Sequence, residues 1–492
     1  MGNTKKKTSG KDLGVKIFLS LTAVLLVVVL LGSALGSSGL LLRMSAPLSS
    51  ANFKVDGAML TYFYRTSYYT MVSQLGEYAS YMGLDTSKPL KSQTYIDGEQ
   101  TWHDYLLTSA TEQAKQMLVL AEAAKAAGMS LDEADQATID ENMTALSETA
   151  ATNGWTSVNS FIAAQYGEGL KEKDIRSALE LSILASKYSQ KMQDDITITD
   201  DEVSTYFDEN KESYTYVSLR QYTFEAGEAL EIEGVTDEQK NEMKADLKKH
   251  ADELAACKSV EEFDAYLTQY MKDNTAATGE ITEDNIQSNL DSTKYETYSS
   301  RTTEQGEWAF AEGRKAGDTT IIEDEENISY TVVMLERPEF RDEALTRNVR
   351  HILFLTEEHT DAAGARAAAE EVLAKWEASG KTENDFAALA TEYTEDTGSA
   401  SNGGLYENVA TGDMVDAFDA WLFDEARKPG DVEIVESEEY GAHIMYYVGE
   451  GQPEWEVNVR SAITTEKYNT AYEALEAATE IKENAGAIKR VD

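Results

Sequence analysis

An internal repeat constrains this chain more than any other feature of its sequence. The segments that begin at Trp308 and Trp421 share the pattern W-x-F-x-E-x-R-K-x-G-D, with seven identities in eleven positions. Self-similarity of this kind is the signature of a duplicated structural unit. The chain is therefore expected to contain two copies of one fold, offset by 113 residues at this motif.

The repeat extends beyond the motif in the N-terminal direction. "SLRQYTF" from Ser218 corresponds to "NVRHILF" from Asn348, and "EEFDAYLTQY" from Glu261 corresponds to "NDFAALATEY" from Asn384. Short β-like runs and amphipathic helical segments alternate in both copies. We predict two α/β domains, one at residues 215–340 and one at residues 345–450.

Outside the repeat the pattern is helical. From about residue 53 to 212, apolar residues recur at three- and four-residue spacing. Capping-box patterns begin at Ser130 and Thr199, each with a glutamate three positions later. We predict an all-α module at 53–212, completed by a C-terminal helix at 453–492, which makes the whole chain α+β.

The N-terminus has the composition of a membrane anchor. Residues 1–16 carry five lysines and one aspartate, and residues 17–42 carry no charge at all. A run of this length can cross a bilayer as a helix, and the lysines place its N-terminal end in the cytoplasm. We expect a single-pass cell-membrane protein that is extracytoplasmic after Arg43. The alternative is a secreted protein whose signal peptide is cleaved near small residues such as Ala34 and Gly36.

Charge and cysteine content exclude several classes of function. Acidic residues outnumber basic ones 89 to 43, so the net charge is −46 and a nucleic-acid partner is disfavoured. Cys257 is the only cysteine, which excludes an internal disulfide or a thiolate metal cluster. The five histidines form no metal-ligand motif, so metal catalysis has little support.

One histidine stands in an unusual context, inside the apolar run "VRHILF". Taken alone, His351 would be a satisfied core histidine. In the first copy, however, the sequence offset places Gln221 at the position of His351 and Tyr330 at the position of His443. The scaffold therefore requires neither histidine, and a functional role becomes the better interpretation.

Further features are confined to the second copy: Gly403-Gly404, Met414 and Phe418. In order along the chain, "VRHILF", "ARAAAEEVLAKW", "DFAALATEYTEDTGSASNGG", "GDMVDAF" and "KPGDVEIVESEEYGAHIMYY" resemble a parvulin (PpiC-type) peptidyl-prolyl isomerase domain from end to end. The surrounding helical region resembles extracytoplasmic foldases of the PrsA and SurA type. The resemblance implies a degenerate first parvulin-like domain and an intact second one.

The resemblance also assigns roles to individual residues. It implies that His351, Asp396 and His443 are catalytic, with the two histidines under the floor of the site and Asp396 beside the substrate amide. It implies that four residues bind the substrate proline: Met414, Phe418, Leu405 and Phe423. The segment "GGLYENV" departs from the family's usual "GGDLGWF", because the aspartate and the third glycine are missing.

Prolyl isomerisation needs neither a metal nor a cofactor, because no bond is broken. Rotation is slow because the amide loses resonance when it twists, so an enzyme has to bind the twisted amide better than the planar forms. The segment after the first strand, "LTEEHTD", is acidic, whereas recognition of phosphoserine requires basic residues. Unfolded exported chains that contain X-Pro bonds are the expected partners, and the sequence specifies no oligomeric state.

Three classes of function follow from these residues. The first is a membrane-anchored prolyl isomerase and foldase, the second is a holdase chaperone whose parvulin domains are catalytically silent, and the third is a cell-surface interaction protein that uses the fold as a scaffold. The first is favoured, because neither of the others has a reason to keep His351 and His443 in one copy alone.

Overall fold

The computed structural model describes residues 39–491 except for 77, 97, 227–235 and 276–281. Helices and strands occur together, which confirms the predicted α+β class. The basic segment 1–16 and all but the last four residues of the predicted membrane segment 17–42 lie outside the described residues. Within the described ranges, no helix has the length and apolar character needed to cross a membrane.

The chain divides into two compact units. Unit 1 holds the described residues up to Thr197 together with those from Thr464 onwards, and unit 2 is Ile198–Ile463. The boundary on the C-terminal side falls inside one helix, α17 (Glu454–Ala478). α9 (Asp200–Glu209) lies in unit 2, where Val203 packs with Val459 and Ile463 of α17. The sequence pattern instead groups α9 with the helical module at 53–212.

Unit 1 is built mainly from long helices. Its core is a cluster of α3, α5 and α8 side chains that includes Leu60, Leu118 and Leu181. The helical elements are α2 (Leu40–Met44), α3 (Gly57–Leu75), α4 (Tyr78–Tyr81), η1 (Leu90–Ser92), α5 (Trp102–Ala126), α6 (Glu133–Thr152), α7 (Val158–Tyr166), α8 (Glu172–Asp194) and α18 (Ala485–Ile488).

Helix caps confirm one of the two predicted capping boxes. Thr199 and Glu202 exchange the expected hydrogen bonds at the start of α9. The box predicted at Ser130 is wrong, because α6 begins two residues later, with Asp132 as N-cap and Asp135 as its partner. Aspartate is at least as favourable an N-cap as serine, so the sequence offered two candidate N-caps for this helix, Ser130 and Asp132.

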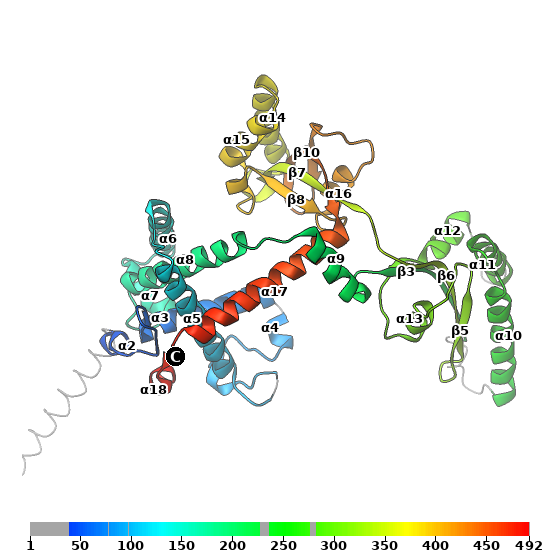
Figure 1. Cartoon of the computed structure of the whole chain (residues 1–492), viewed down its shortest axis with the longest axis horizontal. Coiled ribbons are helices and arrows are strands. Elements are labelled where there is room, and N and C mark those ends of the chain that lie inside the picture. Colours follow the sequence, from blue (N-terminus) through cyan, green and yellow to red (C-terminus); the bar gives the residue numbers. More distant parts are fainter. Residues whose placement is uncertain (1–38, 77, 97, 227–235, 276–281, 492) are drawn as a thin grey trace, which may run out of the picture. The chain divides into compact units, whose positions relative to one another are not determined.

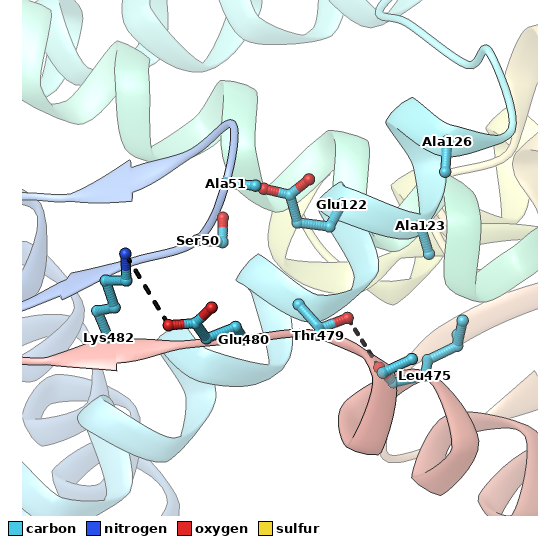
Figure 2. A pocket seen from close by; sticks show the side chains of 10 residues that line it. Ser50, Ala51, Glu122, Ala123, Ala126, Leu475, Thr479, Glu480 and Lys482 are labelled. Carbon is cyan, nitrogen blue, oxygen red and sulfur yellow. Dashed lines mark hydrogen bonds and ion pairs between the residues drawn. The ribbon is translucent and has the colours of Figure 1, made fainter.

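The helical unit is not all-α as predicted, because it contains a small antiparallel sheet. Its strands are β1 (Leu48–Ser49), β2 (Lys54–Val55) and β11 (Lys482–Glu483), in the order β11-β1-β2. The sheet pairs residues near the two ends of the described chain. Beside it lies a hollow of about 410 Å³, lined by alanines of α5, the end of α17, Glu122 and Lys482 (Figure 2).

Unit 2 contains the two copies of the repeat. The first consists of β3 (Tyr216–Glu225), α10 (Asp237–Ala255), α11 (Val260–Thr275), α12 (Glu283–Ser292), β4 (Lys294–Tyr298), α13 (Glu304–Ala309), β5 (Thr319–Asp324) and β6 (Ser329–Phe340), preceded by η2 (Lys211–Ser213). The second consists of β7 (Leu345–Leu355), η4 (Thr356–Glu358), α14 (Ala362–Ala378), α15 (Glu383–Tyr393), η5 (Ala400–Asn402), β8 (Leu405–Val409), α16 (Asp416–Leu422), β9 (Val432–Ser437) and β10 (Gly441–Pro453).

Each copy folds around one four-stranded antiparallel sheet with the same strand order. The orders are β4-β3-β6-β5 and β8-β7-β10-β9. Figure 1 labels β3, β5 and β6 of the first sheet and β7, β8 and β10 of the second. In the second copy α14 and α15 cover one face of the sheet, with Ile352 and Ile444 in that core. α16 covers the other face, where Phe418 and Leu422 pack with Val349 and Met445. This second face carries the candidate site.

Candidate active site

Strand register brings the two predicted histidines together. β10 is antiparallel to β7, with Met445 opposite His351 and His443 opposite Leu353. Residues directly opposite each other share a face, and so do residues two apart on one strand. His351 and His443 are therefore diagonal neighbours on the face that α16 covers. Their ring centroids are 5.6 Å apart, and the ring planes differ by 19°.

Asp396 reaches the same point from the segment that follows α15. This segment runs beside β7: Leu353 N–H donates to Thr394 Oγ1 (3.0 Å), and Glu395 N–H donates to the Leu353 carbonyl (2.9 Å). The Asp396 carboxylate then lies 2.8 Å from Nε2 of His351. The structure therefore brings together all three residues predicted to be catalytic.

Hydrogen-bond partners assign the tautomers of the two rings. The ionised carboxylate of Asp396 can only accept, so Nε2 of His351 carries a proton. In the form in which neither ring is charged, Nδ1 of His443 donates to Nδ1 of His351 across 3.3 Å, and Nε2 of His443 accepts from the Ser437 hydroxyl at 3.1 Å. Backbone N–H groups of Tyr440 and Gly441 donate to the same hydroxyl oxygen. A continuous chain of donors runs from Ser437 to Asp396.

The carboxylate of Asp396 is held ionised. Its Oδ2 accepts from His351, from the Ser399 hydroxyl and from the Tyr406 hydroxyl (3.0 Å), and its Oδ1 accepts from Gly398 N–H (3.0 Å). The hydrogen bond from His351, followed by those from the other donors, lowers the pKa of Asp396 far below its usual value, despite partial burial that acts in the opposite direction. The site therefore carries a fixed negative charge at neutral pH.

The ring of His443 is held neutral. Burial, followed by repulsion from the nearby His351, lowers the pKa of His443 to about 4. Both histidines are almost completely buried, at 5% and 4% exposure. The ring of Tyr406 lies 5.3 Å from that of His351, and its pKa is raised by burial and by the bond to Asp396. The side chain of Asp396 is 18% exposed, more than the ring of either histidine.

Phe418 of α16 packs edge-on against both imidazoles. Its ring centroid lies 5.6 Å from that of His351 and 5.7 Å from that of His443, at interplanar angles of 75° and 87°. Phe418 is only 2% exposed, so it supports the rings from within the domain. Met414 and Phe423 belong to the same apolar cluster and are only partly buried. Their role in binding the substrate proline stays a prediction.

Leu405 does not reach the site, and its predicted place in the substrate pocket is wrong. It pairs with Arg350, whereas its neighbour Tyr406 pairs with Val349. Successive residues of a strand point to opposite faces, so Tyr406 shares the face of His351 and Leu405 faces the other way. In this chain a tyrosine, rather than a leucine, contributes to the histidine site.

The glycine pair allows β8 to approach β7 closely. Gly403 and Gly404 both have left-handed backbones, with φ of 63° and 72°. The Gly404 carbonyl accepts from His351 N–H at 2.8 Å, and a Cβ on Gly404 would lie 2.2 Å from the His351 carbonyl oxygen. Only glycine fits this position without moving the strand that carries His351.

The first copy presents neutral polar groups where the second has its histidines. Gln221 stands at the position of His351, since its N–H donates to the Thr293 carbonyl as that of His351 donates to Gly404. The predicted counterpart of His443, Tyr330, is wrong: Thr331 pairs with Thr223, as His443 pairs with Leu353. The connection from β5 to β6 is one residue longer than its equivalent, which shifts the sequence offset.

Three residues of the site have no counterpart in the sequence predictions: Ser399, Tyr406 and Ser437. Ser399 lies three positions after Asp396, and Ser437 lies six positions before His443. The only sign of either serine's role in the sequence was a polar residue at a turn close to a candidate site residue. In the described part of the chain, no group of three or more His, Cys, Asp or Glu side chains is arranged to hold a metal.

Residues 334–449 match the family model of the PPIC-type PPIase domain. This match covers β6 in part and the whole second copy up to Gly449. It includes all the residues of the site just described. No curated protein matches the sequence.

Solved structures of PrsA peptidylprolyl isomerases are similar to the chain at low identity. The Bacillus cereus protein is 17% identical, covering 66% of this chain and 88% of its own, with a TM-score of 0.19. The Bacillus anthracis protein is 15% identical, covering 60% and 94%, with a TM-score of 0.19. PrsA from Bacillus subtilis is 17% identical, covering 65% and 87%, with a TM-score of 0.18.

Proposed function

The chain carries a PPIC-type peptidyl-prolyl cis-trans isomerase domain at residues 334–449, and on this premise we propose that it is a membrane-anchored, extracytoplasmic foldase that acts on exported polypeptides. The basic segment 1–16 and the uncharged run 17–42 support the anchor and its orientation. The helical unit 1 would provide additional surface for unfolded clients.

The single observation that carries the catalytic part of the proposal is the ionised Asp396 beside the histidine pair. In a planar amide the carbonyl oxygen carries partial negative charge and the nitrogen partial positive charge, and both charges decrease when the bond twists. A carboxylate close to the carbonyl oxygen repels the planar form more than the twisted form. The charge of Asp396 thus lowers the barrier by differential binding, without attack on the substrate.

The surrounding residues keep this charge in place. His351, Ser399 and Tyr406 donate to one carboxylate oxygen and so orient the group before substrate arrives. Ser437 and His443 hold the ring of His351 in the tautomer that donates to Asp396. The partly buried Met414 and Phe423 are proposed to hold the proline ring through apolar contact.

Charge on the described surface supports non-phosphorylated clients. Glu357 and Glu358, which follow the first strand of the domain, are exposed, and His359 is paired with Glu395 at 3.0 Å. Phosphate groups bind to clustered Arg and Lys, not to carboxylates. We therefore expect basic or neutral X-Pro segments to bind better than phosphorylated ones.

A peptide assay with the full chain tests the proposal. The rate of cis-to-trans conversion of a short X-Pro peptide should exceed the uncatalysed rate, and Asp396→Asn should reduce kcat/KM by roughly 10²-fold, the loss typical of one preorganised electrostatic group. Asp416→Asn, an exposed aspartate of α16, is the matched control and should retain activity. A wild-type rate equal to the uncatalysed rate would support the silent holdase instead.

A flotation assay tests the anchor separately. The full chain should float with phosphatidylcholine vesicles, and a chain that lacks residues 1–38 should remain in the aqueous fraction while keeping its isomerase activity. Protease added outside sealed, right-side-out cell preparations should digest the region after residue 43. Protection of that region would contradict the extracytoplasmic assignment.

A further inference from the structure

The first helix of the described chain presents apolar side chains to solvent. Leu40, Leu41 and Met44 of α2 are 45%, 58% and 72% exposed. At about 100° per residue these three positions occupy one arc of the helix surface, while Leu42 packs into a core cluster of unit 1 on another side. Scattered exposed apolar residues are ordinary in proteins. Here they follow directly on the uncharged run that begins at residue 17.

α2 is fixed tightly to unit 1. The Arg43 guanidinium donates from Nε to Oδ1 of Asp174 (2.7 Å) and from Nη2 to the Gly169 carbonyl (2.7 Å). The Asp174 side chain is only 6% exposed, so this ion pair is largely shielded from water. Gly39 has a left-handed backbone (φ 68°), and a Cβ there would lie 2.1 Å from the Gly169 carbonyl oxygen. The backbone at residue 39 therefore lies in close contact with the rest of unit 1.

The length of the uncharged run indicates the depth at which α2 would lie in a bilayer crossed by the proposed anchor. The run covers residues 17–42, whereas a helix needs only about 20 residues to cross the hydrocarbon core of a bilayer. If the proposed crossing begins at residue 17, the last few residues of the run would be surplus to it and would fall in the interfacial region. Apolar side chains on one arc of a helix are suited to the boundary between headgroups and acyl chains.

We propose that α2 seats unit 1 directly on the lipid surface, with Leu41 and Met44 inserted at the headgroup–acyl boundary. The inference rests on the proposed membrane anchor and adds a second contact to it. The partner is a zwitterionic lipid surface, because a net charge of −46 repels anionic lipid. The foldase would then hold its helical unit against the membrane instead of extending it on a flexible tether.

A fluorescent label at position 41 tests the contact. The full chain with Cys257→Ser and Leu41→Cys is labelled with a polarity-sensitive dye and reconstituted in phosphatidylcholine vesicles. Emission should shift to shorter wavelength, and a nitroxide lipid labelled near the headgroup should quench it several-fold more than one labelled at the acyl-chain end. Trp155→Cys, at an exposed position of unit 1, is the matched control and should be quenched only by aqueous iodide.

The outcomes separate this inference from the anchor. If the chain floats with vesicles and iodide quenches the label at 41 as strongly as at 155, the anchor stands and the seating is wrong. If the label is shielded from iodide without lipid quenching, protein covers α2 and the seating is again wrong. If the chain does not float, both proposals fail. Met44→Cys repeats the measurement at a second position of the same arc.

Discussion

The two copies of the repeated fold agree on one face of their sheets and differ on the other. On the face that α14 and α15 cover in the second copy, and on the equivalent face of the first, each copy has an arginine at the same strand position. Arg220 binds Asp264 of α11 and Glu336, and Arg350 binds Glu383 of α15. Both arginine side chains are largely buried, at 7% and 15% exposure. This face links sheet to helix in both copies and belongs to the scaffold.

On the opposite face of the sheet, the two copies share their core residues but differ in their polar residues. Leu219, Val333 and Leu335 of the first copy fill the core in the way that Val349, Met445 and Tyr447 do in the second. Next to them the first copy has Gln221 and a hydrogen bond between Thr223 and Thr331 (2.8 Å). The second has two imidazoles and a carboxylate. A fold that tolerates either set does not require the histidines, which supports the chemical role proposed for them.

The largest expected difference between the copies concerns the backbone at Gly404. Gly404→Ala combines a left-handed φ with a Cβ that overlaps the His351 carbonyl, and we expect a loss of about 3 kcal/mol or more of domain stability. Thr293→Ala, at the equivalent position of the first copy, should cost about 1 kcal/mol, mainly for the hydroxyl bonded to the Leu290 carbonyl. Hydrogen exchange of β7 and β3 amides measures both. Equal losses would show that the glycine is not special.

The second difference is the response to pH. His443 is neutral in the folded domain with its pKa lowered to about 4, so its contribution is fully present above the unfolded pKa of about 6.5 and is lost as pH falls towards 4. The loss should approach roughly 3 kcal/mol at most. Protection of β10 amides should fall over this range in the wild type and fall less in His443→Gln. Thr331→Val in the first copy is the matched control and should leave the β10 response unchanged.

A smaller effect is expected at Tyr406. Tyr406→Phe removes one of the donors to Asp396, a loss of about 1 kcal/mol or a few-fold in kcat/KM, and the acidic limb of the pH–rate profile should move to higher pH because the pKa of Asp396 rises. Tyr295→Phe changes the equivalent tyrosine of the first copy, which is 41% exposed, and should have no effect. An unchanged pH profile in Tyr406→Phe would contradict its positioning role.

The smallest expected effect comes from grafting histidines into the first copy. Gln221→His with Thr331→His, made in an Asp396→Asn background, should add no measurable isomerase activity. The repeat offset places Gln305 where Phe418 stands, so the ring that packs against both imidazoles in the second copy is missing from the first. Activity above the Asp396→Asn background would show that the histidine pair suffices by itself, and the distinction drawn between the copies would then be wrong.

Much of this organisation could be predicted from the sequence, because it depends on composition and on the spacing of motifs. The duplicated motif indicated the repeat, and a comparison of the copies indicated that His351 and His443 are not needed for folding. The resemblance to a parvulin domain added Asp396. All three lie together in the structure, because each sits next to a strand or turn whose register follows from the hydrophobic pattern.

What the sequence could not supply depends on single-residue register. An additional residue between β5 and β6 moved the counterpart of His443 from Tyr330 to Thr331. Strand alternation placed Tyr406, not Leu405, on the histidine face. The hydroxyls of Ser399 and Ser437 entered the site through turns, whose geometry is set by tertiary contacts. A shift of one residue reverses the face of every side chain in a strand.

From the amino-acid sequence alone we could infer that one sheet fold is repeated, that a pair of histidines occurs in only one copy and that residues 17–42 form an uncharged run. The folded structure was needed to show which atom each ring nitrogen contacts, that Phe418 packs against both rings, and that Arg43 ties α2 to the helical unit. The difference arises from the separation along the chain over which each kind of interaction acts. Pattern and composition act between neighbours in the chain, whereas a hydrogen bond at 2.8 Å between His351 and Asp396 depends on how strands and turns 45 residues apart are packed.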